Sequence, residues 1–129
     1  MKEKAADALA DYFDTTIWLN PEMPTPDKDM RYSTYFSGVK PFKQPDYFFF
    51  DHHWELESYD KNFKYGKISN MLKNGAEQSD RIILKLKNKA NIDEVIKRAK
   101  GSLEKSTKHL VNVKQVLLLD VNNKVYPIK

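Results

Sequence analysis

The chain has 129 residues, 40% of them hydrophobic and 31% charged, and a formal net charge of +4. This length predicts a single domain with its own core, and the absence of cysteine excludes disulfides, thiol catalysis and cysteine-ligated zinc. No apolar run approaches the roughly 20 residues that span a bilayer, and no apolar segment near the first residue predicts a signal peptide. We therefore expect a cytoplasmic site of action and no membrane partner.

Charge is distributed unevenly along the chain. Residues 1–59 carry 6 basic and 11 acidic side chains, whereas residues 60–129 carry 16 basic and 7 acidic ones. The net charge of +9 in the second part favours a polyanionic partner, of which nucleic acid is the commonest. The alternative is a lysine-rich solvated surface. Phosphate-binding sites prefer arginine, and the whole chain has only 3 arginines.

The first predicted element is an amphipathic helix over residues 3–13, in which alanine, leucine and phenylalanine recur at helical spacing. Prolines at positions 21, 24 and 26 then predict a loop, and residues 28–44 have only weak periodicity. These features predict two parts, an N-terminal helix with a Pro-rich loop over residues 1–27 and an α+β domain over residues 28–129.

Residues 45–59 predict a β-hairpin. An apolar run from Tyr47 to Phe50 predicts its first strand, and Asp51-His52 forms a polar break. Beyond this break, apolar and polar residues alternate up to Tyr59, which is typical of a half-buried strand. The hairpin brings the residues before and after the break side by side.

Three acids lie on this hairpin, Asp46 on the first strand and Glu55 and Glu57 on the second. Glu55 and Glu57 share one face of their strand, with Cα atoms roughly 6.5–7 Å apart. Three such carboxylates can bind a hard cation such as Mg²⁺ or divide the roles of acid and base, and the alternative is a solvated polar face. His53 shares this face and is a candidate base, whereas the adjacent His52 points away from it.

The remaining segments predict a helix, a strand, a helix capped by Asn91 and two strands joined by an Asn-Asn turn. Their predicted ranges are 67–78, 81–86, 91–105, 113–119 and 124–128. Behind the N-terminal helix the order is therefore β-β-α-β-α-β-β. This order predicts an α+β fold with a mostly antiparallel sheet.

The polar face of the 67–78 helix supplies candidate partners for the acids. Lys67 can orient a scissile phosphate and offset its charge, and Gln78 can donate a hydrogen bond to a phosphate oxygen. Lys61, Lys67 and Lys73 are candidate contacts to a nucleic-acid backbone. Ordinary solvated helix residues are the alternative interpretation of each.

Asp46, the strand Trp54-Glu55-Leu56-Glu57-Ser58 and the stretch from Lys73 to Ile83 resemble a family of small nuclease domains. These domains form the C-termini of contact-dependent growth-inhibition toxins and of some prophage head-morphogenesis proteins. The family has a proline-aspartate, a short strand, glutamate-leucine-lysine before serine or threonine, a helix ending near a glutamine, and an isoleucine/valine strand. The resemblance covers residues 45–128. Gln78 matches the glutamine, and Glu57 departs from the pattern because the family usually has lysine there.

The resemblance implies an endoribonuclease-like hydrolase that cleaves RNA, with tRNA as a substrate class, inside a larger secreted or phage protein and with an acidic immunity protein as partner. A metal-free reaction would use a carboxylate or His53 as base for attack by a 2′-hydroxyl group. A metal-dependent one would hold Mg²⁺ on Asp46, Glu55 and Glu57, and the second carboxylate favours this version. The alternatives are a metal-dependent DNase and an inactive nucleic-acid- or protein-binding module on the same fold.

Overall fold

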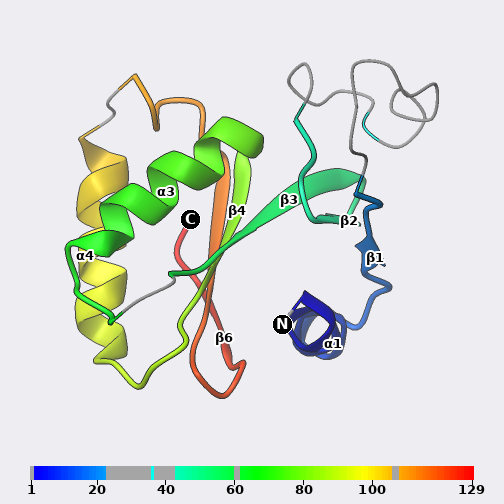
Figure 1. Ribbon diagram of the computed structural model, residues 1–129, viewed down its shortest axis with the longest axis horizontal. Helices are drawn as coiled ribbons and strands as arrows, with labels where there is room; N and C mark the ends of the chain where they lie inside the picture. Colours follow the sequence, from blue (N-terminus) through cyan, green and yellow to red (C-terminus); the bar gives the residue numbers. More distant parts are fainter. Residues whose placement is uncertain (1, 23–35, 37–42, 60–61, 106–107) are drawn as a thin grey trace.

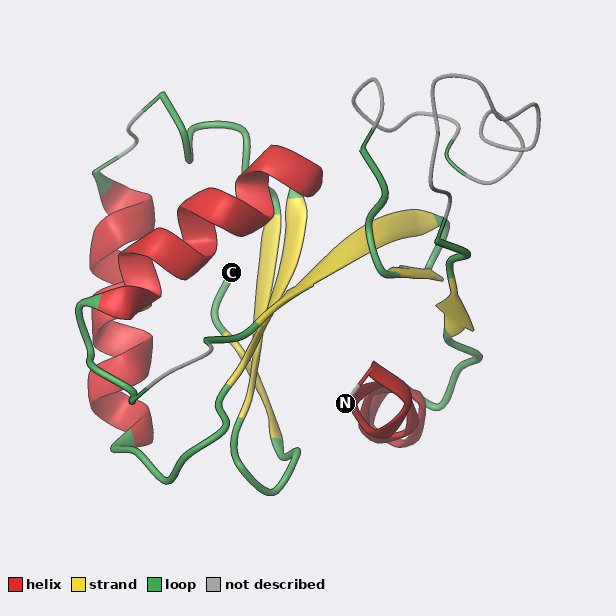
Figure 2. Cartoon of the chain, in the orientation of Figure 1, coloured by secondary structure: helices red, strands yellow, loops and turns green. Residues whose placement is uncertain are grey.

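The computed structural model describes residues 2–22, 36, 43–59, 62–105 and 108–129. Within these residues three helices cover the two faces of a six-stranded sheet, so the predicted α+β class with an N-terminal helix is confirmed (Figures 1 and 2). The elements in chain order are α1 (Lys2–Phe13), β1 (Trp18–Leu19), β2 (Tyr47–Phe49), β3 (His52–Glu57), α3 (Lys67–Gln78), β4 (Arg81–Lys85), α4 (Ile92–Glu104), β5 (Gln115–Leu119) and β6 (Val125–Pro127).

The strands lie in the sheet in their sequence order. Three neighbouring pairs, β1–β2, β2–β3 and β5–β6, are antiparallel, and the two central pairs, β3–β4 and β4–β5, are parallel. Parallel neighbours need a crossover connection, which α3 and α4 supply. Both helices lie on one face of the sheet and α1 lies on the other (Figure 1).

Two hydrophobic cores flank the sheet. Ile82 and Leu84 of β4 point into the core beneath α3 and α4, whereas Ile83 of the same strand points into the core beneath α1. Strand β5 alternates in the same way, which is why β4 and β5 are apolar on both faces. Ala5 and Leu9 of α1 are fully buried, so α1 packs against the sheet and shares its core. The predicted boundary at residue 27 lies outside the described residues.

The hairpin turn differs from the prediction by one residue. Phe49 pairs with His52, so the turn residues are Phe50 and Asp51, and His52 already belongs to β3. Both turn residues have positive φ values, 50° and 60°, as a two-residue turn between antiparallel strands requires. The buried face sets this register, because the Trp54 ring stacks on Phe49 with centroids 4.6 Å apart and its Nε1–H donates to the Phe49 carbonyl.

Candidate functional site

The three acids of the hairpin lie together on the face of the sheet that α3 and α4 cover. Glu55 pairs with Ile82 and Glu57 with Leu84, and paired residues point to the same face. A methyl group placed on Gly75 of α3 would lie 3.1 Å from the Glu57 Cγ atom, so α3 passes directly beside this carboxylate. Glu55 and Glu57 thus share a face with His53, as the period of two predicts, and Glu57 lies beside this helix.

Asp46 directly precedes β2 and is held from three sides. Its Oδ2 atom accepts a hydrogen bond of 2.9 Å from the Leu56 N–H of β3, and its carbonyl accepts one from the Asn20 N–H that follows β1. Gln78, the last residue of α3, accepts the Gln44 N–H through its Oε1 atom. The hydrogen bonds from β1, β3 and α3 thus fix the segment that carries Asp46, and its side chain is only 11% exposed.

Lys2 of α1 brings an ammonium group to these acids. Its Nζ atom lies 2.6 Å from Asp46 Oδ1 and 3.2 Å from Glu22 Oε1, and the Tyr47 hydroxyl donates to the Lys2 carbonyl. Partial burial lowers the pKa of the ammonium group, but the two acids outweigh this effect and raise it. Lys2 could not be identified from the sequence, because no motif or periodicity links it to Asp46, 44 residues later in the chain.

The environment of Glu55 and Glu57 favours their protonated forms. Burial, the Asp46 carboxylate and Glu57 raise the pKa of Glu55 to about 10, against an ordinary value of 4.5. Burial and Asp46 raise the pKa of Glu57 to about 7, with a smaller contribution from Glu77 of α3. The Oε1 atom of Glu55 is buried and has no hydrogen-bond partner. A proton, or another cation, is therefore needed to hold these carboxylates together.

The chemistry of these side chains fits a hard divalent cation, because carboxylate oxygens are the preferred ligands of Mg²⁺ and one of them is buried without a partner. Within the described ranges, however, no three Asp, Glu or His side chains converge as the ligands of an ion would. Both oxygens of Asp46 already have partners, because Oδ2 accepts the Leu56 N–H and Oδ1 pairs with Lys2. An incoming cation would have to compete with Lys2 for Asp46.

His53 is already engaged by other groups. Its Nδ1 atom lies 2.9 Å from the Asn20 Nδ2 atom, and its ring contacts Phe36 and Phe48 at centroid distances of 5.6 and 4.9 Å. Burial lowers the pKa of the imidazole, which favours the neutral ring. An amide nitrogen donates, so the Nδ1 lone pair that a general base would use is occupied. This geometry makes His53 a weaker candidate base than Glu57.

The predicted lysines do not gather around the acids. Lys67 begins α3, about 12 Å along the helix from Gly75, and its Nζ atom lies 5.6 Å from the centre of the Tyr59 ring. Lys73 is exposed and lines a hollow of about 170 Å³ between α3 and α4. Lys61 lies outside the described residues. Two polar residues of α3 were predicted to act on phosphate. Gln78 lies at the C-terminal end of the helix, near Glu57, and Lys67 lies at its N-terminal end, away from the acids.

Comparison of the chain with protein-family models, with curated proteins and with solved structures found no match. None of the helices in the described part of the chain is long and apolar enough to cross a membrane.

Proposed function

We propose that this chain is a nuclease domain that hydrolyses phosphodiester bonds, with RNA, including tRNA, ahead of DNA as its substrate. The observation that carries the proposal is the packing of the Asp46, Glu55 and Glu57 carboxylates, one with a buried oxygen that has no partner. This packing destabilises the ionised forms of Glu55 and Glu57, and groups perturbed in this way are typical of sites that bind cations or transfer protons. The preference for RNA rests on the family resemblance.

Each acid has a distinct role in this proposal. Glu57, with a pKa of about 7, can accept a proton from an attacking water or hydroxyl group near neutral pH. Asp46 is oriented by the Leu56 N–H, and Glu55 hydrogen-bonds to Asp46. In the metal-dependent version, Asp46, Glu55 and Glu57 are the side chains that would hold Mg²⁺, which would supply an activated water. Among the described residues they do not converge as ligands of one ion, so binding would require them to rearrange.

The basic surface of α3 and α4 supports a polyanionic substrate. Two adjoining hollows of about 170 and 470 Å³ lie between these helices and share Ser69, Ser102 and Lys105. Further basic side chains in their lining are Lys73, Lys97, Arg98 and His109, and the acidic one is Glu94, which pairs with Arg98. A backbone bound there would lie on the side of the sheet that carries the acids. The same charge would suit an acidic immunity protein.

The test is cleavage of total tRNA, single-stranded RNA and plasmid DNA, each with Mg²⁺ and with EDTA. We expect RNA cleavage in Mg²⁺ that falls at least a hundredfold in Glu55→Gln and Glu57→Gln. Asp7→Asn is the matched control, because it removes one exposed carboxylate from α1, on the face of the sheet away from the proposed nucleic-acid surface. This control should cleave like the parent.

Other outcomes select other functions. Equal cleavage in EDTA would exclude the role of the cation and leave Glu57 as base for attack by the 2′-hydroxyl group. Cleavage of plasmid alone would make the chain a DNase. Binding of RNA without cleavage, unchanged in both glutamine variants, would identify a non-catalytic nucleic-acid-binding module.

A further inference from the structure

The larger of the two hollows between α3 and α4 has an aromatic residue in its lining. Its volume of about 470 Å³ lies in the range, roughly 300–1,000 Å³, of sites that hold small molecules. Tyr65, which precedes α3, contributes the ring, and Ser69 and Ser102 contribute hydroxyl groups. The hollow therefore combines a flat apolar group with hydrogen-bonding groups and with the positive charge of α4.

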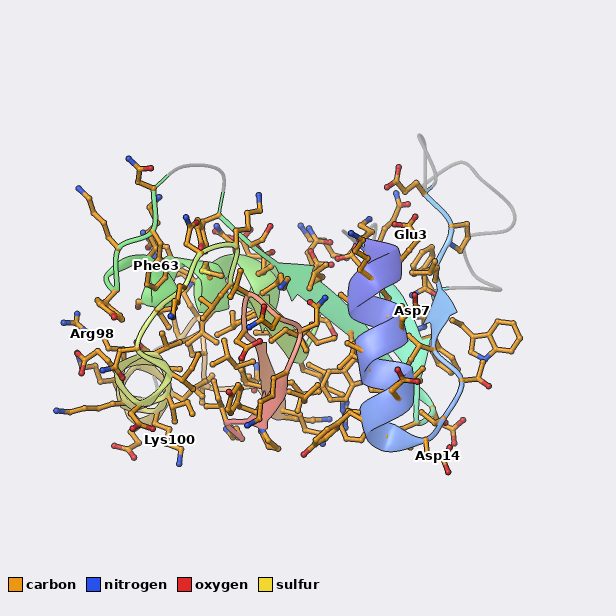
Figure 3. All side chains as sticks on the ribbon, turned by 90° about the horizontal axis from the view of Figure 1, so that it is seen from below. Glu3, Asp7, Asp14, Phe63, Arg98 and Lys100 are labelled. Carbon is orange, nitrogen blue, oxygen red and sulfur yellow. The ribbon has the colours of Figure 1, made fainter. Side chains whose placement is uncertain are left out.

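Three neighbours hold the Tyr65 ring in place. Its hydroxyl accepts the Asn91 N–H at 3.1 Å, and its ring meets the Phe63 ring at 77° with centroids 5.2 Å apart. The Arg98 Cζ atom lies 5.7 Å from the centre of the ring, within the range of a cation–π contact. Figure 3 shows Phe63 and Arg98 at the same end of the molecule. The ring is thus already ordered, so a ligand that stacks on it does not have to order it.

Two lysines flank an open gap in the wall of this hollow. Lys97, Gly101 and Lys105 follow one another at intervals of four residues, so they lie on one face of α4, about 6 Å apart along its axis. All three line the hollow, and nothing beyond the local backbone lies within 4 Å of a methyl group placed on Gly101. The ammonium groups on either side suit two phosphates, and the gap between them suits an uncharged group.

We propose that this hollow is a nucleotide subsite, in which one base of a single-stranded nucleic acid stacks on Tyr65 while Lys97 and Lys105 bind the flanking phosphates. The inference deepens the proposed function, on which its choice of a nucleic acid rests. The bases of a duplex are paired and stacked on one another, so only an unpaired base can enter the hollow. Aromatic side chains stack on any base, so this subsite selects single strands and not a sequence.

The test separates stacking from charge with three labelled probes, whose binding is measured by fluorescence anisotropy in EDTA. The probes are an oligouridylate of about 12 nucleotides, an abasic oligonucleotide with the same number of phosphates, and an RNA duplex of the same length. We expect Tyr65→Leu to weaken binding of the oligouridylate about 5- to 100-fold, which is the effect of losing one stacked base. Its binding to the abasic and duplex probes should stay close to that of the parent, because the phosphate contacts remain.

Further variants distinguish a lost subsite from a damaged fold. Gly101→Leu fills the gap without changing Tyr65 and should show the same selective loss, whereas Tyr65→Phe keeps the ring and should retain most of the binding. Tyr126→Leu is the matched control, because the Tyr126 ring also has a cation–π contact, with Lys124 at 5.3 Å, and lies outside the hollow. This control should bind all three probes like the parent.

Four results would overturn the subsite: equal weakening of all three probes in Tyr65→Leu, no weakening of any, undiminished oligouridylate binding in Gly101→Leu, or no binding by the parent. Selective loss in a parent that cleaves no nucleic acid would support the subsite and refute the nuclease activity. Cleavage without selective loss would do the reverse. The two proposals can thus fail separately.

Discussion

Replacing Glu55 by glutamine is expected to stabilise the fold above pH 5 while abolishing cleavage. The carboxyl group of Glu55 is buried beside Asp46 and Glu57, and its pKa is raised to about 10. A glutamine of the same shape keeps the packing and carries no charge, and its amide can donate to the Asp46 carboxylate. The variant therefore removes the cost of protonating Glu55 on folding, together with the carboxyl group that the proposed function uses.

The sign and size of the effect follow from the pKa shift. Below the ordinary value of 4.5, Glu55 is protonated in both the folded and the unfolded chain and contributes nothing. Above it, the unfolded chain loses the proton and the folded chain keeps it, so the parent loses up to about 1.4 kcal/mol of stability per pH unit. At pH 7 this reaches at most about 3 kcal/mol, and partial exposure of the side chain reduces it to about 2 kcal/mol.

The assay is urea denaturation in EDTA at pH 5, 7 and 8 for the parent, Glu55→Gln and Glu94→Gln. The free energy of unfolding of Glu55→Gln should exceed that of the parent by an amount that grows with pH. Glu94→Gln removes an exposed partner of Arg98 and should stay within about 0.5 kcal/mol of the parent at each pH. A difference that does not change with pH, or a Glu55→Gln variant less stable than the parent at pH 8, would refute the electrostatic reasoning.

Further variants test the packing around the site and the basic surface. Gly75→Ala should cost about 1–3 kcal/mol in urea denaturation, because its Cβ would lie 2.8 Å from the Ile82 Cγ2 atom. Gly101→Ala is the control, because no atom lies within 4 Å of the added carbon, and it should be up to about 1 kcal/mol more stable than the parent. A similar loss of stability in Gly75→Ala and Gly101→Ala would show that the contact with Ile82 is not the cause. Tyr59→Phe should lose about 1–3 kcal/mol, because the buried hydroxyl accepts the backbone N–H groups of Lys87 and Asn88. A loss below about 0.5 kcal/mol would show that these hydrogen bonds do not stabilise the fold. Lys73→Gln should lower the log–log salt slope of RNA binding by about 0.7, and an unchanged slope would show a solvated lysine.

The helices and the acidic strand could be predicted because their patterns are local. The apolar stripe of α3 predicts its observed bounds, and Asn91 caps α4 as expected, accepting the Glu94 N–H through Oδ1 at 3.1 Å. Alternation in β3 also predicts that Glu55 and Glu57 share a face, because the side-chain period of a strand is two. These features depend only on residues close together in the chain.

Contacts between distant segments could not be predicted in the same way. The parallel centre of the sheet depends on how α3 and α4 cross over, and the position of the hairpin turn depends on Trp54 packing beneath α1. The ion pair of Lys2 with Asp46 depends on α1 docking against strands that follow much later in the chain. Sequence periodicity predicts the apolar stripe of α1, but it does not predict which strands of the sheet that stripe packs against.

The acids of α1 and several basic residues of α4 lie far apart in the molecule, which bears on how a polyanion could reach the proposed site. Figure 3 shows Glu3, Asp7 and Asp14 along α1 at one end and Arg98 and Lys100 on α4 at the other. A nucleic-acid backbone attracted by the helical layer would be repelled as it approached three crowded carboxylates. One ammonium group cannot offset three carboxylates together with a phosphate, so protons or a divalent cation must supply the remaining positive charge. Protons would do so at the expense of ionised acids, and a divalent cation would do so without neutralising them, so cleavage assays with Mg²⁺ and with EDTA distinguish the two versions of the proposed function.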